Sequence, residues 1–177
     1  MLRYYLALWA AKLSILALKI THHNGTNFPG IVALKICPNF LKYASKPEKI
    51  IAVTGTNGKT TSANMILDML TLEGYDVLNN KAGSNIASGI STSLIYGMTF
   101  FGKCKHKVGV FEVDERSAKR VYPYLKPQYM LVTNLSRDSI MRNAHPEYIA
   151  DFLSENIPKE TKLVLNADDL ISSGIAP

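Results

Sequence analysis

A short glycine-containing loop holds the residues with the clearest chemical meaning. It follows the apolar run Ile50–Val53 and consists of Gly55, Thr56, Asn57, Gly58, Lys59, Thr60 and Thr61. A triphosphate needs backbone N–H groups aimed at its oxygens, a cation at the β and γ phosphates and a hydroxyl for Mg²⁺. The two glycines permit a tight turn, Lys59 supplies the cation and Thr60 the hydroxyl. The loop therefore predicts a site for a nucleoside triphosphate with Mg²⁺.

The elements around this loop support the same interpretation. The general pattern G-x-x-x-x-G-K-[ST] would place a glycine where the chain has Val53. However, Ile50–Val53 is β-branched at three of four positions, as in a buried parallel strand. From Thr61 to Leu72 apolar residues recur at helical spacing, and Gly74 is a suitable terminator. A phosphate loop between a strand and a helix is thus favoured over a chance Gly-Lys-Thr turn.

Strands and helices alternate along the rest of the chain. Strands are expected at Tyr75–Leu78, Lys107–Val113, Tyr129–Val132 and Lys162–Leu165, and helices at Ile86–Tyr96, Ser117–Tyr124 and Glu147–Asn156. This alternation predicts an α/β fold with a mostly parallel sheet and helices on both faces. We expect this domain to span residues 49–177, after an N-terminal segment, residues 1–48, that contains an amphipathic helix and a connecting stretch.

The first twenty residues are apolar, but charges interrupt them. Arg3, Lys12 and Lys19 argue against a spanning helix, which needs about 20 residues with few or no charges. No small-residue cleavage pattern follows, so a signal peptide is also disfavoured. An amphipathic helix fits better. Two placements stay open for residues 1–20, packing against the domain and contact with a membrane surface.

Composition narrows the class of protein and its partners. The apolar fraction of 47% and the charged fraction of 19% are typical of a globular chain. The formal charge of +6 suits an anionic partner, such as a nucleotide, a pyrophosphate-linked lipid or a membrane surface. No nucleic-acid partner is expected. Cys37 and Cys104 form no Cys-x-x-Cys pair, so no disulfide framework is expected. We expect both to be ordinary small buried residues, and the protein to lie in a reducing cytoplasm.

Several motifs together resemble one family. Val53–Thr61 resembles the ATP-binding signature of the Mur ligase family, which includes the folylpolyglutamate synthases and has this compact glycine spacing. Ala82–Ile86 is similar to the family's glycine-asparagine turn. Glu112 ends a predicted strand where the family places a magnesium-binding glutamate, and Asn166–Asp169 matches a motif after a later strand. The resemblance implies a P-loop domain of the Mur ligase central type.

The family resemblance also implies roles for individual residues. Lys59, Asn85 and Glu112 would be catalytic, and Thr60 and Glu112 would bind Mg²⁺. Asn85 would lie near the γ-phosphate of ATP, which the loop residues Gly55–Thr61 hold. The family phosphorylates a carboxylate with ATP, and an amine then attacks the acyl phosphate.

Within the family, the chain resembles the MurT-type branch, which forms one subunit of lipid II isoglutaminyl synthases. Gly25–Gly30, Glu112–Glu115 and Thr133–Asp138 are the segments that indicate this branch. The resemblance implies lipid II as substrate and a heterodimer with a GatD-type glutaminase, in the cytoplasm or peripheral at the inner face of the membrane. Two alternatives stay open, a Mur or folylpolyglutamate-type ligase that adds an amino acid and a non-catalytic nucleotide-binding module.

The chain departs from the branch at Ser139–Asn143, where Mur ligases carry a histidine that binds metal. This puts a second metal site in doubt, and nearby His145 is expected at the surface. The chain ends directly after a predicted strand and turn. We therefore expect part of a longer protein, with a C-terminal domain and a four-cysteine site for structural Zn²⁺ further downstream. The 177-residue chain alone is expected to be inactive.

Four further acidic residues have less specific patterns. Alternation along a strand would place Asp114 on the same side as Glu112, where it could extend the metal shell. Glu115 fits a solvated helix start. Asp168 and Asp169 fit turn-forming and helix-capping roles.

Overall fold

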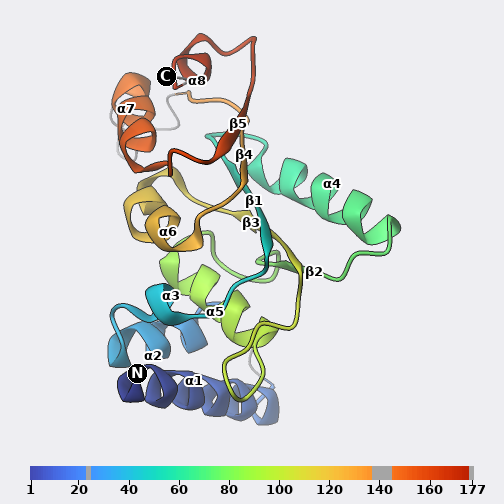
Figure 1. Ribbon diagram of the computed structural model, residues 1–177, viewed down its shortest axis with the longest axis vertical. Coiled ribbons are helices and arrows are strands. Elements are labelled where there is room, and N and C mark those ends of the chain that lie inside the picture. The colour runs from blue at the N-terminus through green and yellow to red at the C-terminus, as the bar shows by residue number, and fades with distance from the viewer. Residues whose placement is uncertain (23–24, 137–144, 176–177) are drawn as a thin grey trace.

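The computed structural model describes residues 1–22, 25–136 and 145–175, and it contains a five-stranded sheet (Figure 1). The strands are β1 (Lys49–Thr54), β2 (Val77–Asn79), β3 (Val108–Glu112), β4 (Tyr129–Val132) and β5 (Lys162–Leu165). Their order is β2-β3-β1-β4-β5, and every neighbouring pair is parallel. The central strand β1 is therefore the one that leads into the phosphate loop.

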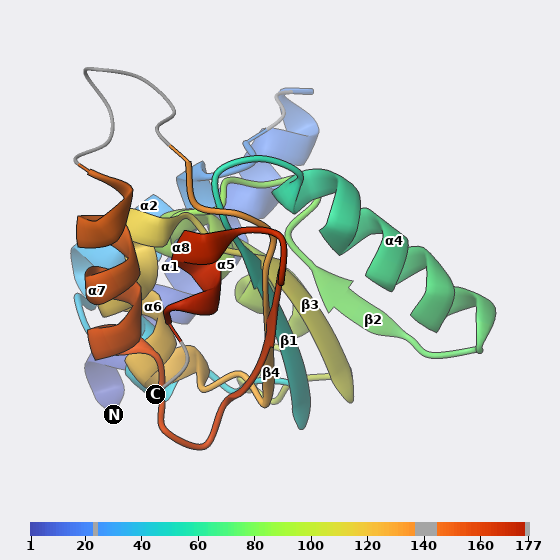
Figure 2. The same ribbon diagram turned by 90° about the horizontal axis from the view of Figure 1, so that it is seen from above.

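Helices cover both faces of the sheet. Helix α4 (Lys59–Leu72) lies on one face, whereas α5 (Ala87–Gly97), α6 (Ala118–Leu125) and α7 (Pro146–Asn156) lie on the other, as Figures 1 and 2 show. A short helix, α8 (Leu170–Ser173), follows β5. The predicted α/β fold with a parallel sheet is thus confirmed.

The N-terminal helices α1 (Leu2–Ile20), α2 (Phe28–Ile36) and α3 (Phe40–Tyr43) pack beside α5. Helix α1 buries Tyr4, Ala7, Leu8 and Ala11 in the hydrophobic core that also contains strand residues. Helices α2 and α5 approach closely at Gly30, where a Cβ atom would lie 1.8 Å from the Ser88 carbonyl oxygen. Packing of the first helix against the domain is therefore confirmed. No helix in the described part of the chain is both long and apolar enough to cross a bilayer.

The boundaries of β4 and β5 agree with the sequence prediction, but those of β2 do not. Strand β2 begins at Val77 instead of Tyr75. Gly74 adopts φ +84° after α4, and the Tyr75 N–H donates to the Leu70 carbonyl at 3.0 Å. Tyr75 therefore belongs to the C-terminal turn of α4, because its N–H satisfies a carbonyl that the helix end leaves open.

Candidate active site

The candidate site lies at the carboxyl ends of β3, β1 and β4, the edge at which parallel α/β sheets bind their ligands. The register aligns these ends, since Val53 of β1 is opposite Glu112 of β3 and Thr54 is opposite Val132 of β4. The phosphate loop, Glu112 and the segment after β4 consequently lie side by side, although they are far apart in the sequence.

Two glycines shape the phosphate loop. Gly55 and Gly58 have φ values of +125° and +80°, which favour glycine over residues with a Cβ atom. A Cβ on Gly55 would also lie 2.3 Å from the Thr133 hydroxyl oxygen. Gly55 therefore allows the loop to contact the segment after β4, while Gly58 precedes the first turn of α4.

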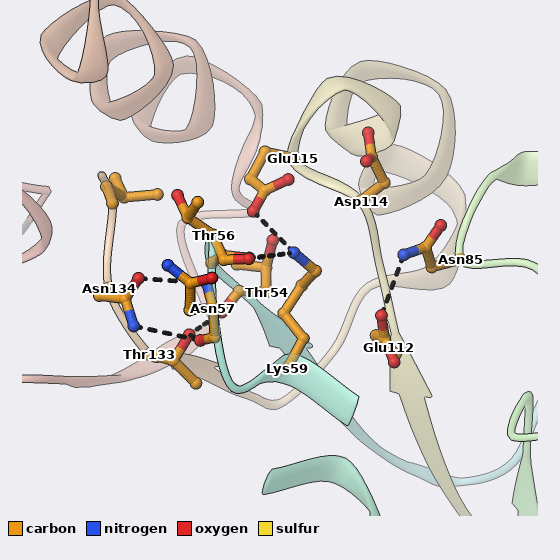
Figure 3. Close-up of polar contacts among 12 residues, drawn as sticks. Thr54, Thr56, Asn57, Lys59, Asn85, Glu112, Asp114, Glu115, Thr133 and Asn134 are labelled. Carbon is orange, nitrogen blue, oxygen red and sulfur yellow. Dashed lines mark hydrogen bonds and ion pairs between the residues drawn. The ribbon is translucent and has the colours of Figure 1, made fainter. Parts of the chain in front are cut away.

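The segment after β4 supports the phosphate loop (Figure 3). The Thr56 N–H donates to the Asn134 carbonyl at 2.7 Å, and the Asn57 N–H donates to the Asn134 side-chain oxygen at 3.1 Å. The Thr133 hydroxyl donates to the Asn57 carbonyl at 2.7 Å. The sequence analysis used Thr133 and Asn134 only as marks of resemblance and missed this bracing role. Their position directly after a predicted strand was the available signal.

Lys59 begins α4, and its ammonium group turns back toward the loop. Nζ donates to the carbonyl oxygens of Gly55 and Thr56, the latter at 3.1 Å. It also pairs with Glu115 Oε1 at 3.3 Å. The cation predicted to bind phosphate is therefore held beside the loop by a buried carboxylate.

Glu112 is contacted by two other predicted site residues. Thr60 Oγ1 donates to Oε2 at 2.7 Å, and Asn85 Nδ2 donates to Oε1 at 2.9 Å. Asn80 holds the backbone of Glu112 from both sides, because its Oδ1 accepts from the Glu112 N–H at 2.9 Å and its Nδ2 donates to the Glu112 carbonyl at 2.8 Å. The sequence analysis did not single out Asn80, and its place after β2 was the only signal.

The oxygen atoms of Thr60 and Glu112 fit Mg²⁺. This ion prefers oxygen ligands and is usually held by one or two carboxylates together with phosphate oxygens and water. No group of three or more His, Cys, Asp or Glu side chains converges within the described residues. Nucleotide phosphates and water would thus complete the coordination shell. Thr61 is exposed on the first turn of α4, next to this pair.

Glu115 departs most from the prediction. The expected solvated position is wrong, since Glu115 is only 6% exposed and pairs with Lys59. The chain leaves β3 through the 3₁₀ turn Glu115–Ser117, which Asp114 caps by accepting from the Arg116 N–H at 3.0 Å. This turn directs Glu115 inward. Burial raises the pKa of the Glu115 carboxyl above its ordinary value of 4.5, although Lys59 opposes the shift.

Asp114 does not share the side of Glu112, so that prediction is also wrong. Strand alternation ends with the strand, and β3 ends at Glu112. Figure 3 shows the Asp114 carboxylate pointing away from Glu112. The Asp114 N–H instead donates to the Asn85 carbonyl at 2.8 Å, which helps to place the Asn85 turn.

The later acidic residues have structural roles. Asp169 caps α8, since its carboxylate accepts from the Ser172 N–H at 3.2 Å, and it also accepts from the Leu135 N–H at 2.7 Å. Helix capping by Asp169 is therefore confirmed. Asp168 is exposed in the preceding turn, and its N–H donates to Asn166 Oδ1 at 3.1 Å.

The predicted surroundings of His145 and of the two cysteines can also be compared with the structure. The surface position of His145 is confirmed, because its side chain is 87% exposed. Cys37 is buried as expected, but Cys104 is only partly buried, and both thiols are free. The atypical segment Ser139–Asn143 lies outside the described residues.

A cleft of about 750 Å³ opens beside the phosphate loop. Lys59, Asn85 and Glu115 line it together with two arginines, Arg116 and Arg120. Arg116 lies in the 3₁₀ turn after β3, and Arg120 lies in the first turn of the following helix α6. Neither arginine was predicted from the sequence as a site residue. The cleft therefore combines Lys59 with two further basic side chains.

The fold and the site together define a P-loop α/β domain, with a lysine at the start of a helix and a carboxylate at the end of the neighbouring strand. Residues 53–176 match the Mur ligase middle domain. The chain therefore belongs to the Mur ligase family.

Three similar proteins place the chain within this family. It is 35% identical over 170 residues to "Lipid II isoglutaminyl synthase (glutamine-hydrolyzing) subunit MurT" of Staphylococcus aureus (strain COL), which covers 95% of the chain and 38% of that protein. It is 32% identical over 132 residues to UDP-N-acetylmuramoylalanine--D-glutamate ligase of Corynebacterium jeikeium (strain K411), covering 74% of the chain and 25% of that ligase. A solved pseudomurein peptide ligase type C from Methanothermus fervidus matches with a TM-score of 0.58 and 26% identity, over 79% of this chain and 27% of that one. The chain thus spans less than half of each protein.

Proposed function

We propose that this chain is the ATP-binding part of an amidating ligase subunit, which converts D-glutamate in the lipid II stem peptide to D-isoglutamine. The observation that carries the proposal is the contact set at the strand ends, where Glu112 joins Thr60 and Asn85 beside the phosphate loop. Such a site suits phosphoryl transfer from ATP to a carboxylate. The similarity to the S. aureus MurT subunit over 95% of the chain supports the choice of substrate.

The chain contributes mainly position and charge to the proposed reaction. ATP would phosphorylate the substrate carboxylate, and ammonia would then attack the acyl carbon and release phosphate. The loop residues Gly55–Thr61 would hold the triphosphate with their N–H groups, while Lys59 would exchange Glu115 for phosphate oxygens. Asn85 can hydrogen-bond the γ-phosphate or the incoming carboxylate. Mg²⁺, held by Thr60 and Glu112, would supply charge neutralisation.

A second protein supplies the ammonia in this proposal. A glutaminase of the cysteine type needs an activated thiolate beside a base. Cys37 is buried, the Cys104 thiol contacts the His106 carbonyl at 3.5 Å, and neither is among the described residues that line the cleft. We therefore assign glutamine hydrolysis to a GatD-type partner in a cytoplasmic heterodimer. A structural Zn²⁺ site, which the family resemblance implies, stays a prediction.

A ligase that adds an amino acid is the second candidate. It is favoured by the 32% identity to the C. jeikeium D-glutamate ligase over 74% of the chain. Both candidates use the same phosphate site and differ in the nucleophile that attacks the acyl phosphate. The intact Thr60–Glu112 pair argues against a module that binds nucleotides without catalysis.

The decisive experiment joins the complete protein with its glutaminase. The protein is co-expressed with a GatD-type glutaminase, and the purified complex is supplied with lipid II, ATP and glutamine. Mass spectrometry should show replacement of one carboxyl OH by NH₂ in the stem peptide, and Lys59→Ala should abolish it. Addition of an amino acid, with no amidation, would instead establish the second candidate.

A further inference from the structure

The outward face of α1 carries an apolar stripe that the protein core leaves uncovered. Its residues recur at spacings of three, four or seven positions, which places them on one side of the helix. They are between 50% and 75% exposed: Leu2, Leu6, Leu13, Leu16 and Ile20. The opposite side of α1 is buried in the core, and α1 lies at the periphery of the molecule (Figure 1), so the exposed stripe faces outward.

An aromatic turn extends the stripe on the same side of the molecule. The chain turns tightly after α5, where the Thr99 N–H donates to the Lys103 carbonyl at 2.8 Å. Phe100 stacks on Trp9 of α1 with ring centroids 5.5 Å apart, and the Trp9 indole N–H donates to the Phe100 carbonyl at 3.1 Å. Phe100 and Phe101 are 58% and 81% exposed. We call this turn and the α1 stripe together the apolar ridge.

The positive charge of the chain is concentrated in the same region. Residues 1–47 contain six Lys and Arg residues and no Asp or Glu, whereas residues 48–177 contain fourteen of each. The whole formal charge of +6 therefore belongs to residues 1–47. The aromatic turn adds Lys103 and Lys105, both exposed. Burial lowers the pKa of Lys12, and repulsion from Lys105 lowers it further. The ridge is thus bordered by cations.

An exposed apolar face with aromatic side chains and basic borders is suited to the interface of a lipid bilayer. Helices that lie in the plane of a bilayer insert apolar residues at the headgroup boundary and place Lys and Arg near anionic lipids. Trp and other aromatic rings favour the same boundary, and each nearby cation strengthens attachment to an anionic surface. A protein partner would instead have to bring an acidic surface that complements these cations.

We propose that the apolar ridge is a docking surface for an anionic phospholipid bilayer, on which α1 lies parallel to the membrane plane. The side chains of the ridge enter the headgroup region, while Arg3, Lys19, Lys103 and Lys105 contact lipid phosphates. None of the ridge residues is among the described residues that line the cleft at the phosphate loop. Docking therefore leaves the nucleotide site accessible.

Trp9 provides a direct measurement, because it is the only tryptophan of the chain. The 177-residue protein is mixed with vesicles of phosphatidylcholine alone or of phosphatidylcholine with phosphatidylglycerol. We expect co-sedimentation with the anionic vesicles and a blue shift of Trp9 emission. Binding to neutral vesicles should be about tenfold weaker, and added salt should weaken anionic binding, since screening acts on exposed charges.

Matched double substitutions test whether the ridge itself makes the contact. Leu13→Ser with Leu16→Ser should weaken vesicle binding by about tenfold or more, because two inserted apolar side chains are lost. The control is Met65→Ser with Met69→Ser on α4, where the side chains are 57% and 63% exposed but Asp68 lies between them. The control should bind vesicles normally. Circular dichroism and retained nucleotide binding show that both variants are folded.

Reversing the positive charges beside the apolar ridge is the second test of membrane binding. Lys19→Glu with Lys103→Glu should remove the preference for phosphatidylglycerol while leaving the apolar stripe intact. Equal binding of the original protein to neutral and anionic vesicles, or normal binding by the Leu13 and Leu16 variant, would overturn the proposal. So would self-association that the same variant abolishes in sedimentation experiments without lipid, because the ridge would then join two copies of the chain.

Discussion

Glu112 and Glu115 are three residues apart, yet their surroundings differ in every respect that matters for chemistry. Glu112 ends β3 and accepts hydrogen bonds from Thr60 at 2.7 Å and Asn85 at 2.9 Å. Glu115 lies in the following 3₁₀ turn, is 6% exposed and pairs with Lys59 at 3.3 Å. Neutral donors therefore surround one carboxylate, and a cation neutralises the other.

This difference assigns the two carboxylates to separate tasks. Neutral partners can turn away when a metal ion arrives, so Glu112 is suited to bind Mg²⁺. Glu115 already has a positive partner, and that partner is the lysine proposed to bind phosphate. Glu115 is therefore suited to hold Lys59 until a triphosphate takes its place, and removing each group should give a different result.

Lys59→Ala should have the largest effect on activity. The variant loses the phosphate-binding cation, and we expect activity of the assembled enzyme to fall by about a thousandfold. It also leaves Glu115 buried without its cation, which should lower the melting temperature. Activity assays with the glutaminase partner and thermal unfolding measure the two effects.

The double variant Lys59→Ala with Glu115→Gln is the matched control. A neutral Gln does not need the lysine, so the melting temperature should recover while activity stays lost. If the melting temperature does not recover, the ion pair is not what stabilises this end of β3.

Glu112→Ala should reduce activity by about a hundredfold or more, because Mg²⁺ loses its carboxylate ligand. The loss should be accompanied by a higher Mg²⁺ requirement, which titration of activity against Mg²⁺ would show. Nucleotide binding without Mg²⁺ should be nearly unchanged. An unchanged Mg²⁺ requirement would contradict the assignment of Glu112 as a metal ligand.

Asn85→Ala should reduce activity by about tenfold to a hundredfold, the usual effect of removing a group that orients a metal ligand. Its side-chain NH₂ orients Glu112 at 2.9 Å in this structure. Asn85→Asp is the sharper control, since it adds a negative charge beside Glu112 and should be more harmful than alanine. Steady-state kinetics of both variants would show whether the aspartate is more harmful than the alanine.

Glu115→Gln should have the smallest effect and the opposite sign for nucleotide affinity. Removing a buried negative charge near the phosphate loop should tighten ATP binding by about threefold. Because burial raises the pKa of Glu115 above 4.5, the folded protein holds this proton at pH values where the unfolded chain has released it. Ionisation of Glu115 therefore lowers stability as the pH rises from 4.5 through the folded pKa.

Thermal unfolding at several pH values tests this sign. The melting temperature of Glu115→Gln should decline less than that of the original protein as the pH rises through this window. Weaker ATP binding by the variant would mean that Glu115 positions Lys59 productively instead of restraining it.

The sequence alone determined the elements whose signals are local. Val77–Asn79 aside, the strands and the helix after the phosphate loop follow from short apolar runs, helical spacing and the two loop glycines, which act over a few neighbouring residues. Lys59 and Thr60 were predicted from the loop itself, whereas Glu112 was predicted from the resemblance to the Mur ligase family. Their types and their places at the ends of elements are visible along the chain.

Tertiary structure decided which distant groups meet and which way each side chain points. The bracing of the loop by Asn134 depends on β4 lying beside β1, and the Lys59–Glu115 pair depends on the turn after β3. Strand alternation did not predict that turn, because the Asp114 carboxylate accepts a hydrogen bond from the Arg116 N–H and the alternation of side chains stops there. Local patterns thus specified the chemical groups, whereas burial and pairing, which depend on packing between elements, specified the partner of each carboxylate.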